Sequence, residues 1–275
     1  MYLPKLRKGV KIELHRRFDG KIKSVTVSKT SDGEYYASIL VETENPRNKV
    51  VEPKSKACGI DLELEHFATV TNDFGSYKLE HPRYLRLGEE RLKRLQRHFS
   101  RKQKGSKNSE KARLKLARQH AYIANARNDF LHKLSKAIID ENQVVVVEDI
   151  NVKGLLKTRL AKSITDSGWS KFLTYIKYKA EWYGRTFIQV DRFFPSSKLC
   201  HRCGYKNEDL ALHDRTWCCS ACGENHDRDV NASINLYFVG LGRHEGMQAL
   251  VDDRSPNGLP KKPSCDEAGS SAFHG

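Results

Sequence analysis

The chain has 275 residues, enough for one large domain or two small ones with a hydrophobic core. Charged residues make up 30% of it and the formal net charge is +15, so its surface favours polyanions such as nucleic acids. No segment approaches the roughly 20 apolar residues of a membrane span, and the N-terminal MYLPKLRKGV lacks the apolar region of a secretory signal. These features argue against a membrane or secreted protein and predict a cytoplasmic protein that binds nucleic acid.

A small β-meander is predicted between residues 10 and 43. The segments KSVTVSKT and YYASILVET have the composition of strands, and Asp19-Gly20 and Asp32-Gly33 supply turn signals. Residues 44 to 56, with two prolines and mixed charge, indicate a linker. Beyond it, ACGIDLE, HFATVTND and SYKLEH predict a second run of strands.

The next segment, residues 82 to 140, predicts a helical hairpin. Apolar residues recur there at helical spacing, and KQKGSKNSE interrupts them, with Gly105 as a stop and Ser109 as an N-cap. Residues 81 to 140 hold 17 lysines and arginines against 5 acidic residues, so most of the excess charge lies here. A solvated basic face is one interpretation, but the excess exceeds what solubility requires and favours contact with phosphates.

Alternating strands and helices complete the chain. QVVVVEDI (143 to 150) has the pattern of a strand buried on both faces, SGWSKFLTYIKYKAEWYG predicts a helix ended by Gly184, and RTFIQVD predicts another strand. DVNASINLYFVG begins a last short helix, and the polar segment beyond Gly240 predicts a disordered tail. Aromatic residues at helical spacing usually bury themselves, so four are expected to pack against the sheet: Trp169, Tyr178, Trp182 and Tyr183.

Two CxxC pairs, 15 residues apart, predict a metal site. Each pair can bend around one ion while the loop between them forms a hairpin, which is the pattern of a tetrahedral zinc ribbon built from Cys200, Cys203, Cys219 and Cys222. A closed shell of four thiolates predicts a structural Zn²⁺ rather than a catalytic one.

Other residues compete for this site. Cys218 can replace Cys219, and His201 and His226 offer nitrogen ligands, although four cysteines already fill the shell. Reduced structural cysteines are the simpler alternative. Cys58 and Cys265 belong to no motif.

Three carboxylates stand at the ends of predicted elements. Asp61 lies in the apolar strand CGIDLE, Glu148 ends VVVVE, and Asp229 opens the final helix. An unpaired buried charge costs on the order of several kcal/mol, and a divalent metal is the simplest compensation. Converging carboxylates can hold two Mg²⁺ or Mn²⁺ ions, which activate water for phosphodiester hydrolysis. Each acid could instead be an N-cap, an edge-strand acid or an arginine partner, and Asp149 and Asp227 compete by adjacency.

Several motifs in order resemble TnpB, a family of transposon-encoded, RNA-guided nucleases similar to the type V CRISPR effectors. They are GIDLELEHFATVTNDFG, VVVVEDINVKGL, the stretch from SGWSKFL to CHRCG, and CGENHDRDVNASINL. The hairpin segment is similar too, and the resemblance covers roughly residues 4 to 240.

The resemblance implies an α/β fold with a RuvC-type, RNase H-like mixed sheet, a helical hairpin, an inserted four-cysteine zinc ribbon and a preceding short β-meander. The implied divisions are the last strands of a wedge or OB-like β-domain (1–50), a nuclease core (57–198) with the basic hairpin (82–140), the ribbon (199–224), the end of the core (225–240) and the tail (241–275).

The family's catalytic acids match Asp61, Glu148 and Asp229, with the ribbon inserted just before the third. By the same matching, Arg228 and Asn231 position the third acid or touch the strand being cut, and the serines and Lys198 of PSSK bind phosphate. Arg127 and Lys133 are expected to follow the guide–target heteroduplex.

The implied activity is that of a transposon-associated, metal-dependent DNA endonuclease. Its partners are DNA, single-stranded or as a displaced strand, and a guide RNA in the full-length family. The family's helical recognition region and most of its wedge domain, which read the guide and the motif beside the target, are missing from this sequence. We therefore expect the chain to keep the residues for DNA cleavage but to lack the regions that direct it to a target.

Two other functions compete with cleavage. The basic hairpin also suits a catalytically silent nucleic-acid-binding fragment, whose binding depends on salt and not on the acids. A transposase that joins DNA ends ranks lower, because the sequence offers no tyrosine in a His-x-His setting.

Overall fold

The computed structural model describes residues 7–15, 17–43, 52–211 and 213–242. Most of the predicted linker (44–51), most of the predicted tail (243–275) and Cys265 lie outside these residues. The chain forms two compact units, Met1–Lys49 with Tyr84–Ala126, and Val50–Arg83 with Arg127–Gly275. None of the described helices is both long enough and apolar enough to cross a bilayer.

The first unit combines a β-hairpin with a helical hairpin. Strands β1 (Lys21–Lys29) and β2 (Tyr35–Glu42) pair antiparallel, and Gly33 turns the chain between them at a φ of 92°. The predicted meander is thus a two-stranded hairpin in the described residues. Helix α1 (Tyr84–Ser100) is followed by α2 (Lys107–Glu141), whose last part belongs to the second unit.

The helical hairpin is confirmed, but its predicted N-cap is wrong. The side chain of Ser106, not Ser109, accepts a hydrogen bond at the start of α2, from the Ser109 amide at 3.1 Å. Ser109 therefore lies within the first turn. Both serines precede the same helical pattern, so sequence alone does not separate them.

A mixed five-stranded sheet forms the centre of the second unit, in the order β5-β4-β3-β6-β7. Three strands make an antiparallel meander, namely β3 (Ser55–Asp61), β4 (Ala68–Asn72) and β5 (Gly75–Leu79). β6 (Asn142–Glu148) runs parallel to β3, and β7 (Thr186–Val190) runs parallel to β6. The predicted strand buried on both faces is confirmed in β6, where Val145, Val146 and Val147 are fully buried.

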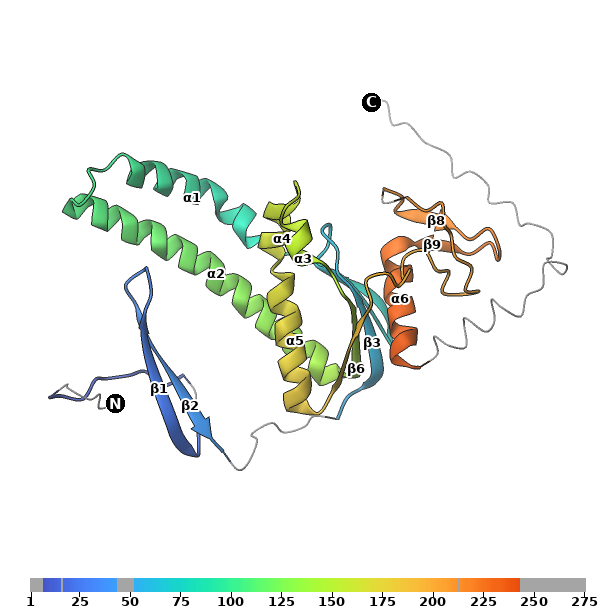
Figure 1. The fold of residues 1–275 in the computed structure, drawn as a ribbon, viewed down its shortest axis with the longest axis horizontal. Helices are drawn as coiled ribbons and strands as arrows, with labels where there is room; N and C mark the ends of the chain where they lie inside the picture. Colours follow the sequence, from blue (N-terminus) through green and yellow to red (C-terminus); the bar gives the residue numbers. More distant parts are fainter. Residues whose placement is uncertain (1–6, 16, 44–51, 212, 243–275) are drawn as a thin grey trace. The chain divides into compact units, whose positions relative to one another are not determined.

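Successive side chains of each strand point to opposite faces of the sheet, and helices pack against both faces. Ile60 and Val147 pack with the end of α2 and with α5 (Trp169–Tyr183), which supplies Phe172. The other face of β3 and β6 is covered by α6 (Arg228–Gly240). Figure 1 shows α5 and α6 on opposite sides of β3 and β6.

The last helix approaches the sheet at a glycine. A Cβ atom at Gly59 of β3 would lie 2.2 Å from the Ser233 carbonyl oxygen and 2.3 Å from the Tyr237 amide nitrogen of α6. Only glycine lets the backbones of strand and helix come this close. The tight contact fixes the helix that carries Asp229 against the strand that carries Asp61.

Helix α5 ends as predicted, because Gly184 caps it in the left-handed conformation with a φ of 63°. Trp169 is buried, as expected, but Trp182 is 61% exposed, so its predicted packing against the sheet is wrong. Its ring instead contacts the edge of Tyr178, with centroids 4.7 Å apart. Two short helices, α3 (Val152–Leu155) and α4 (Ala161–Ser167), precede α5.

Candidate active site and metal centre

Strand register places two of the predicted acids side by side. Ile60 of β3 is opposite Val147 of the parallel strand β6, so the next residues, Asp61 and Glu148, end neighbouring strands. Both alternate with residues of the α2–α5 core and therefore face α6. Asp229 lies in the first turn of α6.

The three predicted acids line one cavity of about 170 Å³. Its other walls come from the segment before the first cysteine pair, from the loop between the two cysteine pairs and from the start of α6. The residues are Ser196, Ser197, Lys198, Leu210, Ala211 and Arg228. The cavity thus brings together Asp61, Glu148 and Asp229 with two of the four basic residues expected to contact nucleic acid.

The electrostatics of the cavity disfavour several negative charges at once. Burial raises the pKa of Asp61 well above its ordinary value, and the nearby Glu148, Asp229 and Glu63 raise it further, while Arg228 opposes them. Asp61 keeps some surface toward the cavity, but protein surrounds it on the other sides. Burial also raises the pKa of Glu148. A cation bound between these groups would relieve the repulsion and replace the lost hydration.

This repulsion predicts an effect of pH on stability. Asp61 is ionised above about pH 4 in the unfolded chain, but its pKa is raised in the fold, so the folded state loses stability as the pH rises from 4 toward 7. Asp61→Asn removes this penalty. In buffer free of divalent cations we expect it to be more stable than wild type at pH 7, with a smaller difference at pH 4. Urea unfolding followed by circular dichroism measures both values, and a variant less stable at pH 7 would contradict the prediction.

Two arginines hold the third acid. The side chain of Asp229 is only 7% exposed, and its Oδ2 lies 3.2 Å from Nη1 of Arg215 while its Oδ1 lies 3.5 Å from Nε of Arg228. Arg215 was not predicted. It lies 14 residues before Asp229, on the other side of the second cysteine pair, and no local sequence pattern indicates that the chain folds back there onto the acid.

Glu63 is a second residue that the sequence reasoning missed. It is buried, its Oε1 accepts a hydrogen bond from Thr69 Oγ1 at 2.8 Å, and Nδ1 of His66 lies 3.4 Å from the same oxygen. Burial, and then the neighbouring Asp229, raise the pKa of Glu63. Its i, i+2 spacing from Asp61 is the signal that could have placed it near the acids.

The two competing acids have other partners. Asp149 pairs with Arg192 at 2.6 Å and accepts a hydrogen bond from Gln189 at 2.9 Å. Asp227 caps α6 through the amides of Asp229 and Val230, and it pairs with Lys78 at 2.9 Å. Neither residue lines the cavity. Asp227 is thus an N-cap and Asp149 an arginine partner, and of the three predicted acids Asp229 also has arginine partners.

The remaining predicted nucleic-acid contacts are divided. Lys198 lines the cavity and donates to the Glu208 carbonyl oxygen at 2.8 Å. Arg127 and Lys133 lie on α2 away from the cavity lining, where Arg127 donates to the Thr165 carbonyl oxygen at 2.7 Å and Lys133 pairs with Asp129 at 2.7 Å. Contact of these residues with nucleic acid stays a prediction.

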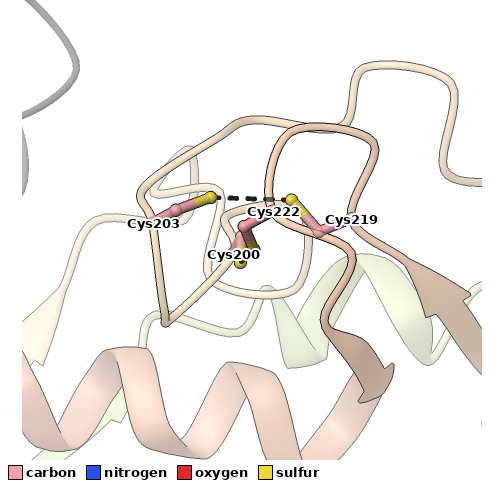
Figure 2. A group of neighbouring side chains, drawn as sticks. All are labelled: Cys200, Cys203, Cys219 and Cys222. Atoms are coloured by element: carbon pink, nitrogen blue, oxygen red, sulfur yellow. Dashed lines mark hydrogen bonds between the residues drawn. The ribbon is translucent and has the colours of Figure 1, made fainter. Parts of the chain in front are cut away.

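Four cysteine thiols converge beside α6, as Figure 2 shows. The Sγ atoms of Cys200, Cys203, Cys219 and Cys222 all lie within 4.8 Å of one another. Two of the pairs, Cys203–Cys219 and Cys200–Cys222, are 3.6 and 3.7 Å apart. Zn–S bonds of about 2.3 Å in a tetrahedron place sulfurs about 3.8 Å apart, so the thiols fit one zinc ion.

Each cysteine pair sits on a tight turn closed by the glycine after it. The amide of Gly204 donates to the Cys200 carbonyl oxygen at 2.9 Å, and that of Gly223 donates to the Cys219 carbonyl oxygen at 2.8 Å, both glycines having positive φ. Short strands β8 (Thr216–Cys218) and β9 (Asn225–Asp227) flank the second cysteine pair and pair with each other, and β9 leads directly into α6.

The competing ligands lie outside this cluster. Cys218 ends β8 and is not among the converging thiols. His226 is buried, and its Nε2 lies 3.1 Å from Cys200 Sγ, so it contacts a ligand sulfur from outside the cluster. Burial lowers the pKa of His226 to about 4, so its imidazole is neutral at pH 7. His201 is engaged with Asn231, and Cys58 is buried in β3.

Two family models match the segments of the chain that carry these residues. A family model described as "Probable transposase" (OrfB_IS605) matches residues 38–159, and the "Cas12f1-like, TNB domain" model matches residues 169–236. A "Putative RNA-guided DNA endonuclease" of Streptomyces pristinaespiralis is 44% identical over 220 residues, which are 79% of this chain and 53% of that protein. This chain is TnpB-like over both matched segments.

More distant family members agree with this placement. The "Putative RNA-guided DNA endonuclease InsQ" of Escherichia coli (strain K12) is 30% identical over 87% of this chain and 62% of that protein. "TnpB-like protein L79" of Acanthamoeba polyphaga mimivirus is 26% identical over 80% of this chain and 44% of that protein. This TnpB-like chain thus spans about half the length of the curated relatives it matches.

The fold of this TnpB-like chain is also found in a solved structure. The Cas12f1–sgRNA–target DNA complex superposes with a TM-score of 0.54 at 18% identity, over 78% of this chain and 44% of that one. The two matched family segments both contribute to the cavity. Asp61 and Glu148 lie in the first segment, and Asp229 and the four cysteines lie in the second.

Proposed function

We propose that this chain carries the catalytic part of a TnpB-like, RNA-guided DNA endonuclease, a RuvC-type and RNase H-like nuclease that hydrolyses DNA phosphodiesters. One observation carries the proposal. Carboxylates from two adjacent parallel strands and from the start of α6 line a single cavity whose wall also carries Lys198 and Arg228.

The residues of the cavity have distinct roles in this proposal. Asp61, Glu148 and Asp229 would hold Mg²⁺ or Mn²⁺, which activates water and stabilises the leaving oxygen in phosphodiester hydrolysis. Lys198 and Arg228 supply positive charge at the cavity wall, where a DNA phosphate would enter. The rigid contact at Gly59 keeps the strand and the helix, and so their two carboxylates, in fixed relation.

The cysteine cluster has a structural role in this proposal. Four thiolates would complete the shell of Zn²⁺ and leave no open position for a substrate. The ribbon (199–224) is then an insert between the nuclease core (57–198, with its hairpin at 82–140) and the end of that core (225–240). The strands β1 and β2, within residues 1–50, would belong to a wedge-like domain.

The partners follow from charge and from the relatives. The basic hairpin suits the backbone of a guide–target heteroduplex, with Arg127 and Lys133 among the contacts. DNA as a single or displaced strand would reach the cavity. Because the chain spans about half of its curated relatives, guided cleavage is proposed for the whole protein of this family.

Two adjacent acids allow a matched test of the nuclease site. The purified chain is incubated with labelled single-stranded DNA and either Mg²⁺ or Mn²⁺. Glu148→Gln removes a carboxylate that lines the cavity, and we expect cleavage to fall by at least about a hundredfold, as for a metal ligand. Asp149→Asn changes the next residue, whose carboxylate pairs with Arg192, and should cut like wild type.

Either of two results would overturn the proposal. If Glu148→Gln cuts like wild type, the cavity is not the nuclease site. If wild type binds DNA with strong salt dependence but never cuts it, the chain is the catalytically silent nucleic-acid-binding fragment that its basic hairpin also fits.

A further inference from the structure

A short stretch of chain joins the cavity to the cysteine cluster. This connecting segment, residues 196–199, follows Pro195 and ends at the first ligand, Cys200. Ser196, Ser197 and Lys198 line the cavity, and Leu199 lies next to the cluster. The position of the segment therefore bears on both sites.

Two buried asparagines of α6 hold the connecting segment. Asn235 donates from Nδ2 to the carbonyl oxygens of Ser196 at 2.7 Å and Leu199 at 2.6 Å. Asn231 donates to the Leu199 carbonyl oxygen at 2.8 Å and lies 3.3 Å from those of Ser196 and Ser197. Each asparagine is 1% exposed. The backbone of the segment is thus fastened to the helix that carries Asp229.

The same contacts extend into the cysteine turn. Oδ1 of Asn231 accepts a hydrogen bond from the His201 amide at 3.1 Å and lies 3.0 Å from Nδ1 of the same residue. Cys200 lies between this anchor and the segment, and its sulfur contacts His226. A metal ion at the cluster would fix Cys200 and with it the end of the segment.

At its other end the segment reaches a carboxylate of the cavity. The side chain of Ser196 is buried, and its Oγ donates a hydrogen bond to Oε1 of Glu148. A hydroxyl donor orients the carboxylate without neutralising it. The neighbouring Asp149 differs, because it pairs with Arg192 and does not line the cavity.

We propose that Ser196 is a positioning residue for Glu148, and that metal loading of the cysteine cluster holds it in place through the connecting segment. The inference rests on the proposed function, since it assigns Glu148 a cation to bind. It predicts that cation affinity at the acids depends on a hydroxyl that touches no cation and on a zinc site outside the cavity.

The test measures Mn²⁺ binding directly, by isothermal titration calorimetry on the zinc-loaded protein, without a cleavage assay. Ser196→Ala should weaken Mn²⁺ binding by about tenfold, the low end for hydrogen bonds to metal ligands. Ser196→Thr keeps the hydroxyl and should restore affinity. Ser170→Ala, an exposed serine on α5, is the matched control and should bind like wild type.

A second arm tests the link to the cluster. Zinc-depleted wild type should bind Mn²⁺ more weakly than the zinc-loaded protein, and depletion should change little further in Ser196→Ala. Since depletion can unfold the ribbon, Asn235→Ala is measured as well. It releases the segment from α6 without touching a cysteine, so it should lower Mn²⁺ affinity while one zinc per chain remains.

The outcomes separate the inference from the proposed function. Asp61→Asn must weaken Mn²⁺ binding, and if it does not, or if wild type binds no Mn²⁺, the proposed function fails and the inference with it. If Asp61→Asn weakens binding but Ser196→Ala and Asn235→Ala bind like wild type, the inference alone is overturned.

Discussion

Replacement of Cys219 by alanine is expected to abolish zinc binding by the ribbon. Cys219 is fully buried, and its thiol is one of four that meet within 4.8 Å. Structural zinc contributes an apparent binding free energy of about 10–16 kcal/mol in small metal-dependent domains, and three thiolates leave the shell open to water. The zinc content of the purified protein, measured by mass spectrometry, should fall from one ion per chain to none.

Two other cysteines provide the controls. Cys58→Ala makes the same change at a thiol buried in β3 outside the cluster, and should keep one zinc per chain at a cost of about 1 kcal/mol in unfolding free energy. Cys218→Ala tests the competing ligand next to Cys219. If zinc were lost from Cys218→Ala and retained by Cys219→Ala, the assignment of ligands would be reversed.

Gly59→Ala is expected to be strongly destabilising. The new Cβ would stand 2.2 Å from the Ser233 carbonyl oxygen and 2.3 Å from the Tyr237 amide nitrogen, and both are backbone atoms of a helix. Neither can move unless α6 shifts away from β3. Since overpacking against side chains already costs about 1–3 kcal/mol, we expect a loss of about 3 kcal/mol or more in unfolding free energy, measured by urea unfolding.

A second glycine at the same interface gives a graded comparison. A Cβ at Gly240, the last residue of α6, would come within 2.9 Å of Val146 Cγ2 on β6 and 3.0 Å of Ala57 Cβ on β3, and both of these are side-chain atoms. Gly240→Ala should therefore cost less than Gly59→Ala. Equal losses would contradict the view that backbone contact at Gly59 sets the position of α6.

The parts that the sequence predicts well are those with a local period or spacing. The apolar run of β6 indicates a doubly buried strand, and the acid at its end then falls at the sheet edge where Asp61 also lies. The doubled CxxC spacing predicts the cysteine cluster that the fold assembles. In each case the pattern that decides the structure lies within a few neighbouring residues or occurs twice in the sequence.

The parts that it predicts poorly depend on distant contacts. Trp182 follows the helical spacing of its neighbours but falls on the solvent side, which only the packing of α5 decides. Arg215 reaches Asp229 because the cysteine region folds back on itself. The partner of Asp149 is likewise distant, because Arg192 lies 43 positions further along the chain.

The order of the elements also affects how the protein is made. Asp61 is on the first strand of the central sheet and Asp229 on the last described helix, 168 residues later. Ribosomes add about 5–20 residues per second, so roughly 8–34 s separate the synthesis of the two carboxylates. The cavity cannot close until α6 has emerged and docked on β3. A nascent chain that has not yet reached residue 229 therefore lacks the third acid, and the acidic site is completed only after α6 has been synthesised.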